Sequence, residues 1–323
     1  MKQSLKYFAI GSIMAALVAV AGFAHVSRVQ TSGIANVAYA GSLQLVNDQF
    51  VGPAFTKESR IPYEGRGGGA FGMAHLVESG EIIPNVFESI GTAPFQQMGL
   101  KTPKWAIGFA SSPLVIAYSP NSPYESKLKD IANHKLPLRD LFTLMKQPGF
   151  YLGRTNPNTD PQGQAFILMM HLAEKQLHLP AGSANKILGP NVNPKQIFAE
   201  EAILSRLQSG QLDATSAYLP EAIQHHLPYI TLPATMNMGD PADKSIYARM
   251  HLEVNGKIVW GNPIEIYITL VPGNPNETAG EKFVSFLLSK QGRDIYKQNG
   301  YMLTKFLTWG NQTAIPSSRR AKI

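Results

Sequence analysis

The chain contains no cysteine among its 323 residues. This absence excludes disulfide scaffolding, cysteine–metal sites, thiol nucleophiles and a lipid anchor on an N-terminal cysteine. Charged residues are also scarce, at 16% of the chain, with 29 lysines and arginines against 22 acids. The basic excess is spread along the sequence apart from a short cluster at Arg319, Arg320 and Lys322. No interleaved basic and aromatic face is visible, so we expect no nucleic-acid partner.

The motifs of common enzyme classes are missing as well. There is no Gly-x-Ser-x-Gly elbow and no Walker loop, and Gly65–Gly69 lacks the spacing of a dinucleotide loop. His225 and His226 are adjacent, so on a helix their side chains diverge, and no third ligand stands at metal-binding spacing. We therefore expect no enzyme, no cofactor and no metal site. The alternative is an exported hydrolase that uses Asp160 with His171 or His225.

The N-terminus has the pattern of an export signal. Lys2 and Lys6 precede an apolar run from Tyr7 to Ala24, and Gly22 and Ala24 are small, as a cleavage site requires. We expect residues 1–24 to be a signal peptide and the protein to be periplasmic. A retained membrane anchor is the alternative, and it would leave the rest of the chain outside the membrane.

The remaining length of the chain predicts two lobes, because about 300 residues exceed what one hydrophobic core usually organises. Strand-like apolar runs alternate with helical patterns, which indicates an α/β fold with largely parallel sheets. The expected strands lie at 34–40, 106–109, 114–118, 150–154, 230–232 and 264–270.

Helix signals are clear at four places. The segment 70–79 is apolar on one face and ends at Gly80. Asp160-Pro161 and Asn193-Pro194 each place an N-cap acceptor before a proline, which predicts helices leading into 165–177 and 196–209. A fourth amphipathic helix is expected over 277–289. Asn255-Gly256 predicts a hairpin with a type I′ turn.

Three segments have the chemistry to bind an anion. Backbone amides at helix N-termini and hydroxyl groups suit an oxyanion, and in α/β folds they gather at the carboxyl ends of strands. Such segments are Gly41–Leu43 after the first strand, Gly65–Ala70 before a helix, and Asn156–Gly163 before the helix at Asp160-Pro161.

The third of these segments carries a family resemblance. Gly153–Gly163, GRTNPNTDPQG, with the helix QAFILMMHLAEK that follows, resembles the signature of the molybdate/tungstate-binding proteins of ABC importers, the tungstate-type branch in particular. Gly210–Pro233 is similar to the second ligand segment of that family, and AYAGSL at 38–43 is a looser match. The resemblance covers nearly all of the chain after the signal segment. It implies a two-lobed periplasmic-binding-protein fold of type II, with the ligand in a cleft between lobes joined by two crossing strands.

Four ligand-binding residues follow from the resemblance. Ser42 would bind the anion through its hydroxyl and amide, and Gly69 through its amide. Asp160 matches an aspartate that in the tungstate-type branch can coordinate the metal centre of the anion. Its alternative role is a plain N-cap. Tyr218 matches a tyrosine that donates to an oxyanion oxygen, and its alternative is a buried tyrosine bonded to the backbone.

The sequence departs from the family at two of the expected positions. Gly69 stands where the family has a second serine, and Ala217 stands where the tungstate-type branch has a glutamate. Without that glutamate we expect a tetrahedral ion held by hydrogen bonds. Glu221 is expected to face elsewhere, and Arg66 is a candidate donor in place of the missing hydroxyl. Sulfate, phosphate, another anion or a small organic solute are the alternative ligands.

Together these expectations define a substrate-binding component of an ABC importer. Lobe I would comprise residues 33–112 and 234–310, lobe II residues 113–233, and residues 311–323 a C-terminal tail. The expected partners are a small oxyanion and the membrane permease of an ABC transporter, and the protein is expected to be a monomer. A sensor subunit reporting to a membrane receptor is the alternative role.

Overall fold

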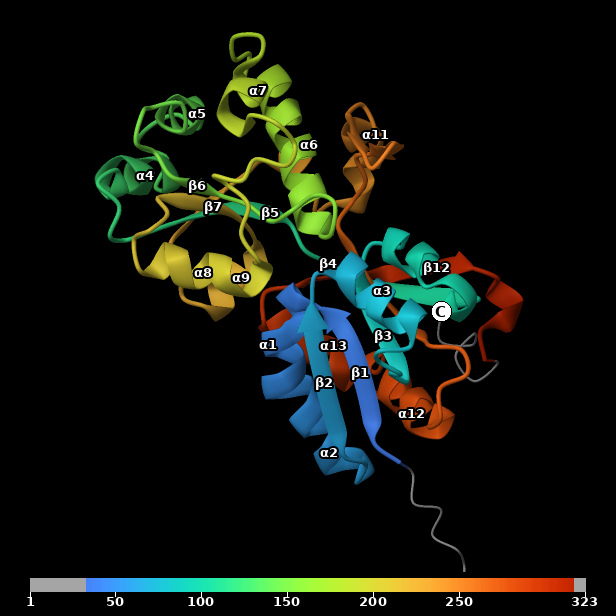
Figure 1. Ribbon diagram of the computed structural model, residues 1–323. Coiled ribbons are helices and arrows are strands. Elements are labelled where there is room, and N and C mark those ends of the chain that lie inside the picture. The colour runs from blue at the N-terminus through green and yellow to red at the C-terminus, as the bar shows by residue number, and fades with distance from the viewer. Residues whose placement is uncertain (1–32, 317–323) are drawn as a thin grey trace, which may run out of the picture. The chain divides into compact units, whose positions relative to one another are not determined.

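The computed structural model describes residues 33–316, so the predicted signal segment at residues 1–24 lies outside the described part of the chain. The described residues form two mixed sheets, a separate two-stranded hairpin and the helices between them (Figure 1). The α/β class is therefore confirmed. Within residues 33–316 no helix is long and apolar enough to cross a membrane.

The larger sheet has six strands in the order β12-β4-β11-β3-β1-β2. They are β1 (Ala35–Ala40), β2 (Tyr63–Gly68), β3 (Val86–Ile90), β4 (Trp105–Ser111), β11 (Glu265–Leu270) and β12 (Met302–Gly310). β1 pairs in parallel with β2 and β3, whereas β11 and β12 pair antiparallel with their neighbours. The prediction of largely parallel sheets is wrong, because the C-terminal part of the chain returns to this sheet in the opposite direction.

Both faces of β1 are buried under helices. Val37 and Tyr39 belong to an apolar cluster that includes Phe55 and Phe283, whose rings meet edge to face at 5.2 Å. These two rings come from α2 (Gly52–Ser59) and α12 (Glu277–Leu287), and α13 (Lys290–Gln298) follows α12. Ala38 faces the other way, toward α3 (Ala70–Ser79). Successive side chains of a strand point to opposite faces, so the run of apolar residues from Val37 to Ala40 fits a central strand that is covered on both faces.

The smaller sheet has four strands in the order β6-β7-β5-β8. They are β5 (Leu114–Tyr118), β6 (Leu152–Gly153), β7 (Ala214–Tyr218) and β8 (Tyr229–Thr231). Only β6 and β7 are parallel. The helices of this part are α4 (Glu125–Ala132), α5 (Arg139–Leu144), α6 (Pro161–Gln176), α7 (Ser183–Leu188), α8 (Glu200–Gln208) and α9 (Leu219–Gln224).

The chain passes between the sheets twice, at Ser112 and between β8 and β11. The two passages are hydrogen-bonded: the Ser112 amide donates to the Ile264 carbonyl at 2.9 Å, and the Ile264 amide to the Met238 carbonyl at 2.7 Å. Gly239 lies so close to Pro113 that a Cβ on it would be 2.5 Å from the proline Cβ. The second passage carries α10 (Ala234–Asn237), α11 (Lys244–Tyr247) and the hairpin of β9 (His251–Val254) and β10 (Lys257–Trp260).

Shorter helical turns complete the described chain. They are η1 (Gly41–Leu43), α1 (Gln44–Val46), the π-helical η2 (Asn47–Val51), η3 (Ala93–Gln97), η4 (Gly99–Lys101), η5 (Pro241–Asp243) and η6 (Gln312–Ala314).

The helix predictions are confirmed, but one of them is wrong about where the helix begins. α3 has the predicted bounds, α12 begins at the predicted residue, and Asn255-Gly256 adopts φ of 51° and 73°, as a type I′ turn requires. The helix expected at Asn193-Pro194 begins only at Glu200. The Asn193 side chain instead accepts from the Lys195 amide at 3.1 Å, forming a local turn.

Candidate functional site

Ser42 lies in the η1 turn that follows β1. The residue is 7% exposed, and the hydroxyl oxygen is buried without a hydrogen-bond partner among the described residues. The carbonyl of Ser42 accepts a hydrogen bond from the Tyr301 hydroxyl at 3.0 Å, which fixes the turn. A buried hydroxyl without a partner is costly, so this oxygen is suited to meet a ligand.

Gly69 is the N-cap of α3 and makes a close approach to the loop before α6. A Cβ on Gly69 would be 3.1 Å from the Thr159 carbonyl oxygen and 3.9 Å from the Asp160 Cβ. No side chain caps α3, so its first amides have no capping acceptor. The glycine that replaces the family's serine therefore stands where the structure leaves little room for a side chain.

Asp160 is the N-cap of α6, as predicted. Its Oδ1 accepts from the Gln162 amide at 2.8 Å, Pro161 occupies the first turn, and the residue is 6% exposed. The N-terminal ends of α3 and α6 thus meet at Gly69 and Asp160. Helix N-termini carry partial positive charge, so their meeting favours an anion.

Tyr218 ends β7 and is joined to a buried carboxyl group. The Glu221 carboxylate accepts from the Tyr218 amide at 2.7 Å and from the Gln162 side chain at 2.8 Å, and Gln162 also contacts the Ser216 hydroxyl at 3.3 Å. The expectation that Glu221 faces elsewhere is wrong. The sequence did indicate the position of Glu221, because proline followed by glutamate is typical of the first turn of a helix, and Pro220 and Glu221 occupy the first turn of α9.

Burial and the nearby Asp160 carboxylate affect the charge of Glu221. Desolvation raises the pKa of the Glu221 carboxyl group to about 8, and the repulsion from Asp160 adds to the rise. Ala217, by contrast, points into an apolar cluster with Val115 and Leu207. A glutamate side chain at position 217 would enter this cluster, whereas Glu221 carries its carboxylate into the polar network.

Three cavities adjoin the four predicted residues. Ser42 lines one of about 300 Å³ together with Glu221, and Gly69 and Asp160 line one of about 330 Å³. Thr155, which the sequence did not single out, lines the latter, and its buried hydroxyl has no partner among the described residues. Thr155 lies just before the predicted anion-binding segment Asn156–Gly163, and its position within the family-like segment Gly153–Gly163 is the signal that could have found it.

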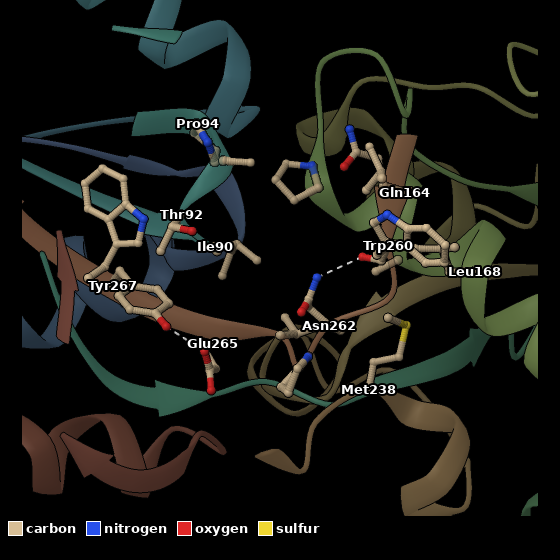
Figure 2. A pocket seen from close by; sticks show the side chains of 18 of the residues that line it. Ile90, Thr92, Pro94, Gln164, Leu168, Met238, Trp260, Asn262, Glu265 and Tyr267 are labelled. Atoms are coloured by element: carbon tan, nitrogen blue, oxygen red, sulfur yellow. Dashed lines mark hydrogen bonds between the residues drawn. The ribbon is translucent and has the colours of Figure 1, made fainter. Parts of the chain in front are cut away.

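Tyr218 lines a third cavity, of about 360 Å³. Figure 2 shows Gln164, Leu168 and Trp260 facing Ile90 and Tyr267 across it. The Tyr267 hydroxyl donates to the Glu265 carboxylate at 2.6 Å. This cavity is mostly aromatic and aliphatic, unlike the polar cavity beside Ser42.

The four residues are therefore connected without sharing one cavity. Gly69 and Asp160 line the same cavity, Asp160 and Tyr218 are linked through Gln162 and Glu221, and Glu221 lines the cavity of Ser42. Arg66 is an exposed residue of β2 and is not among those lining these cavities. Within residues 33–316 no group of three acidic or histidine side chains could hold a metal ion.

The close approach at Gly69 gives a test of this arrangement. Gly69→Ala is expected to weaken binding of an oxyanion at this place about tenfold, because a Cβ against the Thr159 carbonyl costs about 1–3 kcal/mol in a tight contact. His75→Ala in the same helix is the control, since His75 is exposed and is not among the residues lining the three cavities. Isothermal titration of both variants measures the effect, and equal affinities would show that the contact does not limit binding.

Comparison with known proteins identifies the family. The family model of the bacterial extracellular solute-binding protein matches residues 35–302. A Haloferax volcanii protein named as a molybdenum-binding protein of an ABC transporter is 28% identical over 91% of this chain and 89% of its own length. The molybdate/tungstate-binding protein WtpA of Pyrococcus abyssi is 27% identical over 63% of each chain. This chain is 29% identical to a solute-binding protein of Petrotoga mobilis and spans 60% of the length of that protein.

Solved structures have the same fold. The periplasmic molybdate-binding protein of Azotobacter vinelandii superposes with a TM-score of 0.56 over 83% of this chain and 99% of its own, at 15% identity. The sulfate-binding protein SubI of Mycobacterium tuberculosis gives 0.55 over 88% of each chain, at 14% identity. These likenesses confirm the type II periplasmic-binding-protein fold, and with the family match they establish that the chain belongs to the bacterial extracellular solute-binding proteins.

Proposed function

We propose that this protein is the substrate-binding component of an ABC importer and captures a tetrahedral oxyanion of the molybdate or tungstate kind. The observation that carries the proposal is the meeting of two helix N-termini, at Gly69 and Asp160. The uncapped end of α3 offers its first backbone amides and partial positive charge, which suit a dianion. At the end of α6, Pro161 has no N–H group and the Gln162 amide is bonded to Asp160, so this end contributes mainly its partial positive charge. The names of the relatives from Haloferax and Pyrococcus support the same ligand class.

Each predicted residue has a role in this proposal. Ser42 donates its buried hydroxyl, the amides after Gly69 donate from α3, and the Tyr218 hydroxyl donates to a ligand oxygen. Asp160 holds the first turn of α6 in place and borders the anion. The Thr155 hydroxyl is a further donor beside Gly69 and Asp160. Hydrogen bonds to a charged acceptor are worth about 1.5–3 kcal/mol each, so a few of them suffice for tight binding.

Binding would close two lobes around the anion. Residues 33–112 with 234–310 form lobe I, residues 113–233 form lobe II, and 311–323 are a tail. The two hydrogen-bonded passages at Ser112–Ile264 and Ile264–Met238 would serve as the hinge. A membrane permease would recognise the closed, monomeric form in the periplasm. The protein itself performs no covalent chemistry in this account.

A thermal-shift panel tests the proposal. Ligand that binds only the folded state stabilises it by about 2.7 kcal/mol at a hundredfold excess over the dissociation constant. We expect molybdate and tungstate to raise the melting temperature well above the effect of sulfate and phosphate at equal ionic strength. A shift with sulfate or phosphate alone would assign a different anion. Absence of any shift with the four anions would refute oxyanion capture.

The third cavity favours a second candidate, a small organic solute. Its volume of about 360 Å³ is within the range of ligand pockets, and Trp260, Tyr267 and Leu168 give it apolar walls. Glu265 and Lys244 add one group of each charge. Organic zwitterions in the same thermal-shift panel separate the candidates, since Trp260→Ala would reduce their effect and leave that of molybdate unchanged.

A further inference from the structure

A buried carboxyl group lies behind the Ser42 turn. Glu88 of β3 is fully buried, and no ion pair joins it to a cationic side chain within residues 33–316. Burying a carboxyl group without a cation is costly, because both its charge and its oxygens lose water. The groups that satisfy Glu88 therefore indicate what it does in the fold.

Two donors bind the Glu88 carboxylate, and one of them, Asn47, also bonds directly to the Ser42 turn. The Asn47 side-chain amide donates to Glu88 Oε2 at 2.9 Å and to the Leu43 carbonyl at 3.1 Å. The Tyr296 hydroxyl of α13 donates to Glu88 Oε1.

The second link runs through an aromatic pair. The Tyr296 ring lies 4.8 Å from the ring of Tyr301, and the Tyr301 hydroxyl donates to the Ser42 carbonyl at 3.0 Å. Adjacent carbonyls of the turn, those of Ser42 and Leu43, are therefore both held by groups that Glu88 organises. A shift of either group would move the Ser42 hydroxyl and amide.

We propose that Glu88 positions the Ser42 turn through Asn47 and Tyr296, and that the negative charge on Glu88 opposes capture of an anion at that turn. The inference rests on the proposed function. A single amide group, that of Asn47, separates the carboxylate from the turn, so a bound dianion and an ionised Glu88 repel each other in a medium of low dielectric constant. Binding should therefore favour the protonated form of Glu88.

The surroundings of Glu88 place its titration near neutral pH. Burial raises the pKa of the Glu88 carboxyl group to about 7, while the hydrogen bonds from Tyr296 and Asn47 lower it in part. The titratable groups that face it are Tyr296 from α13 and Tyr39 from β1, whose hydroxyl is turned to Asp48. Glu88 is then neutral below about pH 6 and ionised in the free protein above about pH 8.

The test compares molybdate affinity of the wild type and Glu88→Gln by isothermal titration at constant ionic strength. We expect equal dissociation constants near pH 6 and about tenfold tighter binding by the variant near pH 8. The ratio of the two constants at each pH is the readout, because Glu221 also titrates in this range and contributes equally to both proteins. Glu58→Gln, which removes an exposed carboxylate of α2, is the control and should follow the wild type.

Two further variants test the links. Tyr301→Phe should weaken binding by the same factor at every pH, because it loosens the turn without changing a charge near it. Tyr296→Phe removes a donor to the ionised carboxylate, which raises the pKa of Glu88 and should move the loss of affinity to higher pH. This variant takes the place of Glu88→Gln if Glu88→Gln does not fold.

If the molybdate dissociation constants of the wild type and Glu88→Gln stay within about twofold of each other from about pH 6 to about pH 8, this inference is overturned and the proposed function stays intact. Absence of saturable molybdate or tungstate binding by the wild type at either pH would instead refute the proposed function, and the inference would fall with it.

Discussion

Replacing Arg154 by methionine is expected to lower the free energy of unfolding by about 3–5 kcal/mol. Arg154 is fully buried and directs its guanidinium to three acceptors: the Gln196 side chain at 3.0 Å and the carbonyls of Asn191 and Pro190 at 2.8 and 2.9 Å. Methionine fills similar space but leaves all three acceptors without a donor. Burial lowers the pKa of Arg154 to about 10, so the group stays charged at neutral pH.

Urea unfolding measures this effect, and Arg249→Met is the matched control. Arg249 is exposed, so its replacement should change the free energy of unfolding by no more than about 0.5 kcal/mol. Because Arg154 immediately precedes the Thr155–Asp160 loop, the variant should also bind molybdate more weakly. Stability of Arg154→Met within about 1 kcal/mol of the wild type would mean that the three acceptors find other donors.

The second large effect is expected at Ser42. Ser42→Ala should weaken molybdate binding by about 10- to 100-fold, because it removes one hydrogen bond to a charged acceptor, worth about 1.5–3 kcal/mol. The same change should leave the unliganded protein as stable as the wild type or more so, since the hydroxyl has no partner among the described residues. Opposite effects on binding and on stability are characteristic of a ligand-binding group.

Ser111→Ala controls for the removal of a buried hydroxyl as such. Ser111 lies in β4, is fully buried, and its hydroxyl likewise has no partner in residues 33–316. It is not among the residues lining the three cavities. We expect its molybdate affinity to equal that of the wild type, measured by isothermal titration. If the two variants bind alike, Ser42 is not a ligand-binding residue.

Local signals in the sequence predicted the helices well wherever a cap and an apolar face agreed. Asp160-Pro161 meets both conditions, and α6 begins there. Asn193-Pro194 has the cap alone, because the residues that follow it form a turn and the apolar face starts only near Ile203. Asparagine before proline is as suited to a turn as to a helix, so only the downstream pattern could have separated the two.

Strands were harder to predict, for physical reasons. β2 contains three glycines in six residues and follows β1 in parallel register, so its pairing depends on a partner distant in sequence rather than on its own side chains. β12 carries half-buried residues with no clear alternation, at the edge of the sheet beside β4. The antiparallel return of β11 and β12 likewise depends on tertiary contacts that no local pattern specifies.

The candidate site was predicted only in part. Ser42, Gly69, Asp160 and Tyr218 follow from the family resemblance, and their roles in binding remain predictions. What the sequence could not supply is the side-chain direction at β7 and α9, where Ala217 turns into the apolar cluster and Glu221 into the polar network. Ala217 lies on β7 and Glu221 in the first turn of α9, so their directions depend on where the strand ends and the helix begins, which sequence patterns place only to within one or two residues.

The most direct measurement is a crystal structure of the protein grown with tungstate, using the anomalous scattering of tungsten to locate the anion. We expect one strong tungsten peak beside Asp160 and Tyr218. It should be placed so that the oxygens of the anion lie within hydrogen-bonding distance of the Ser42 hydroxyl and the first amides of α3. A peak against Trp260 and Tyr267 and out of reach of Ser42 and α3, or no peak in a crystal soaked far above saturation, would contradict this proposal.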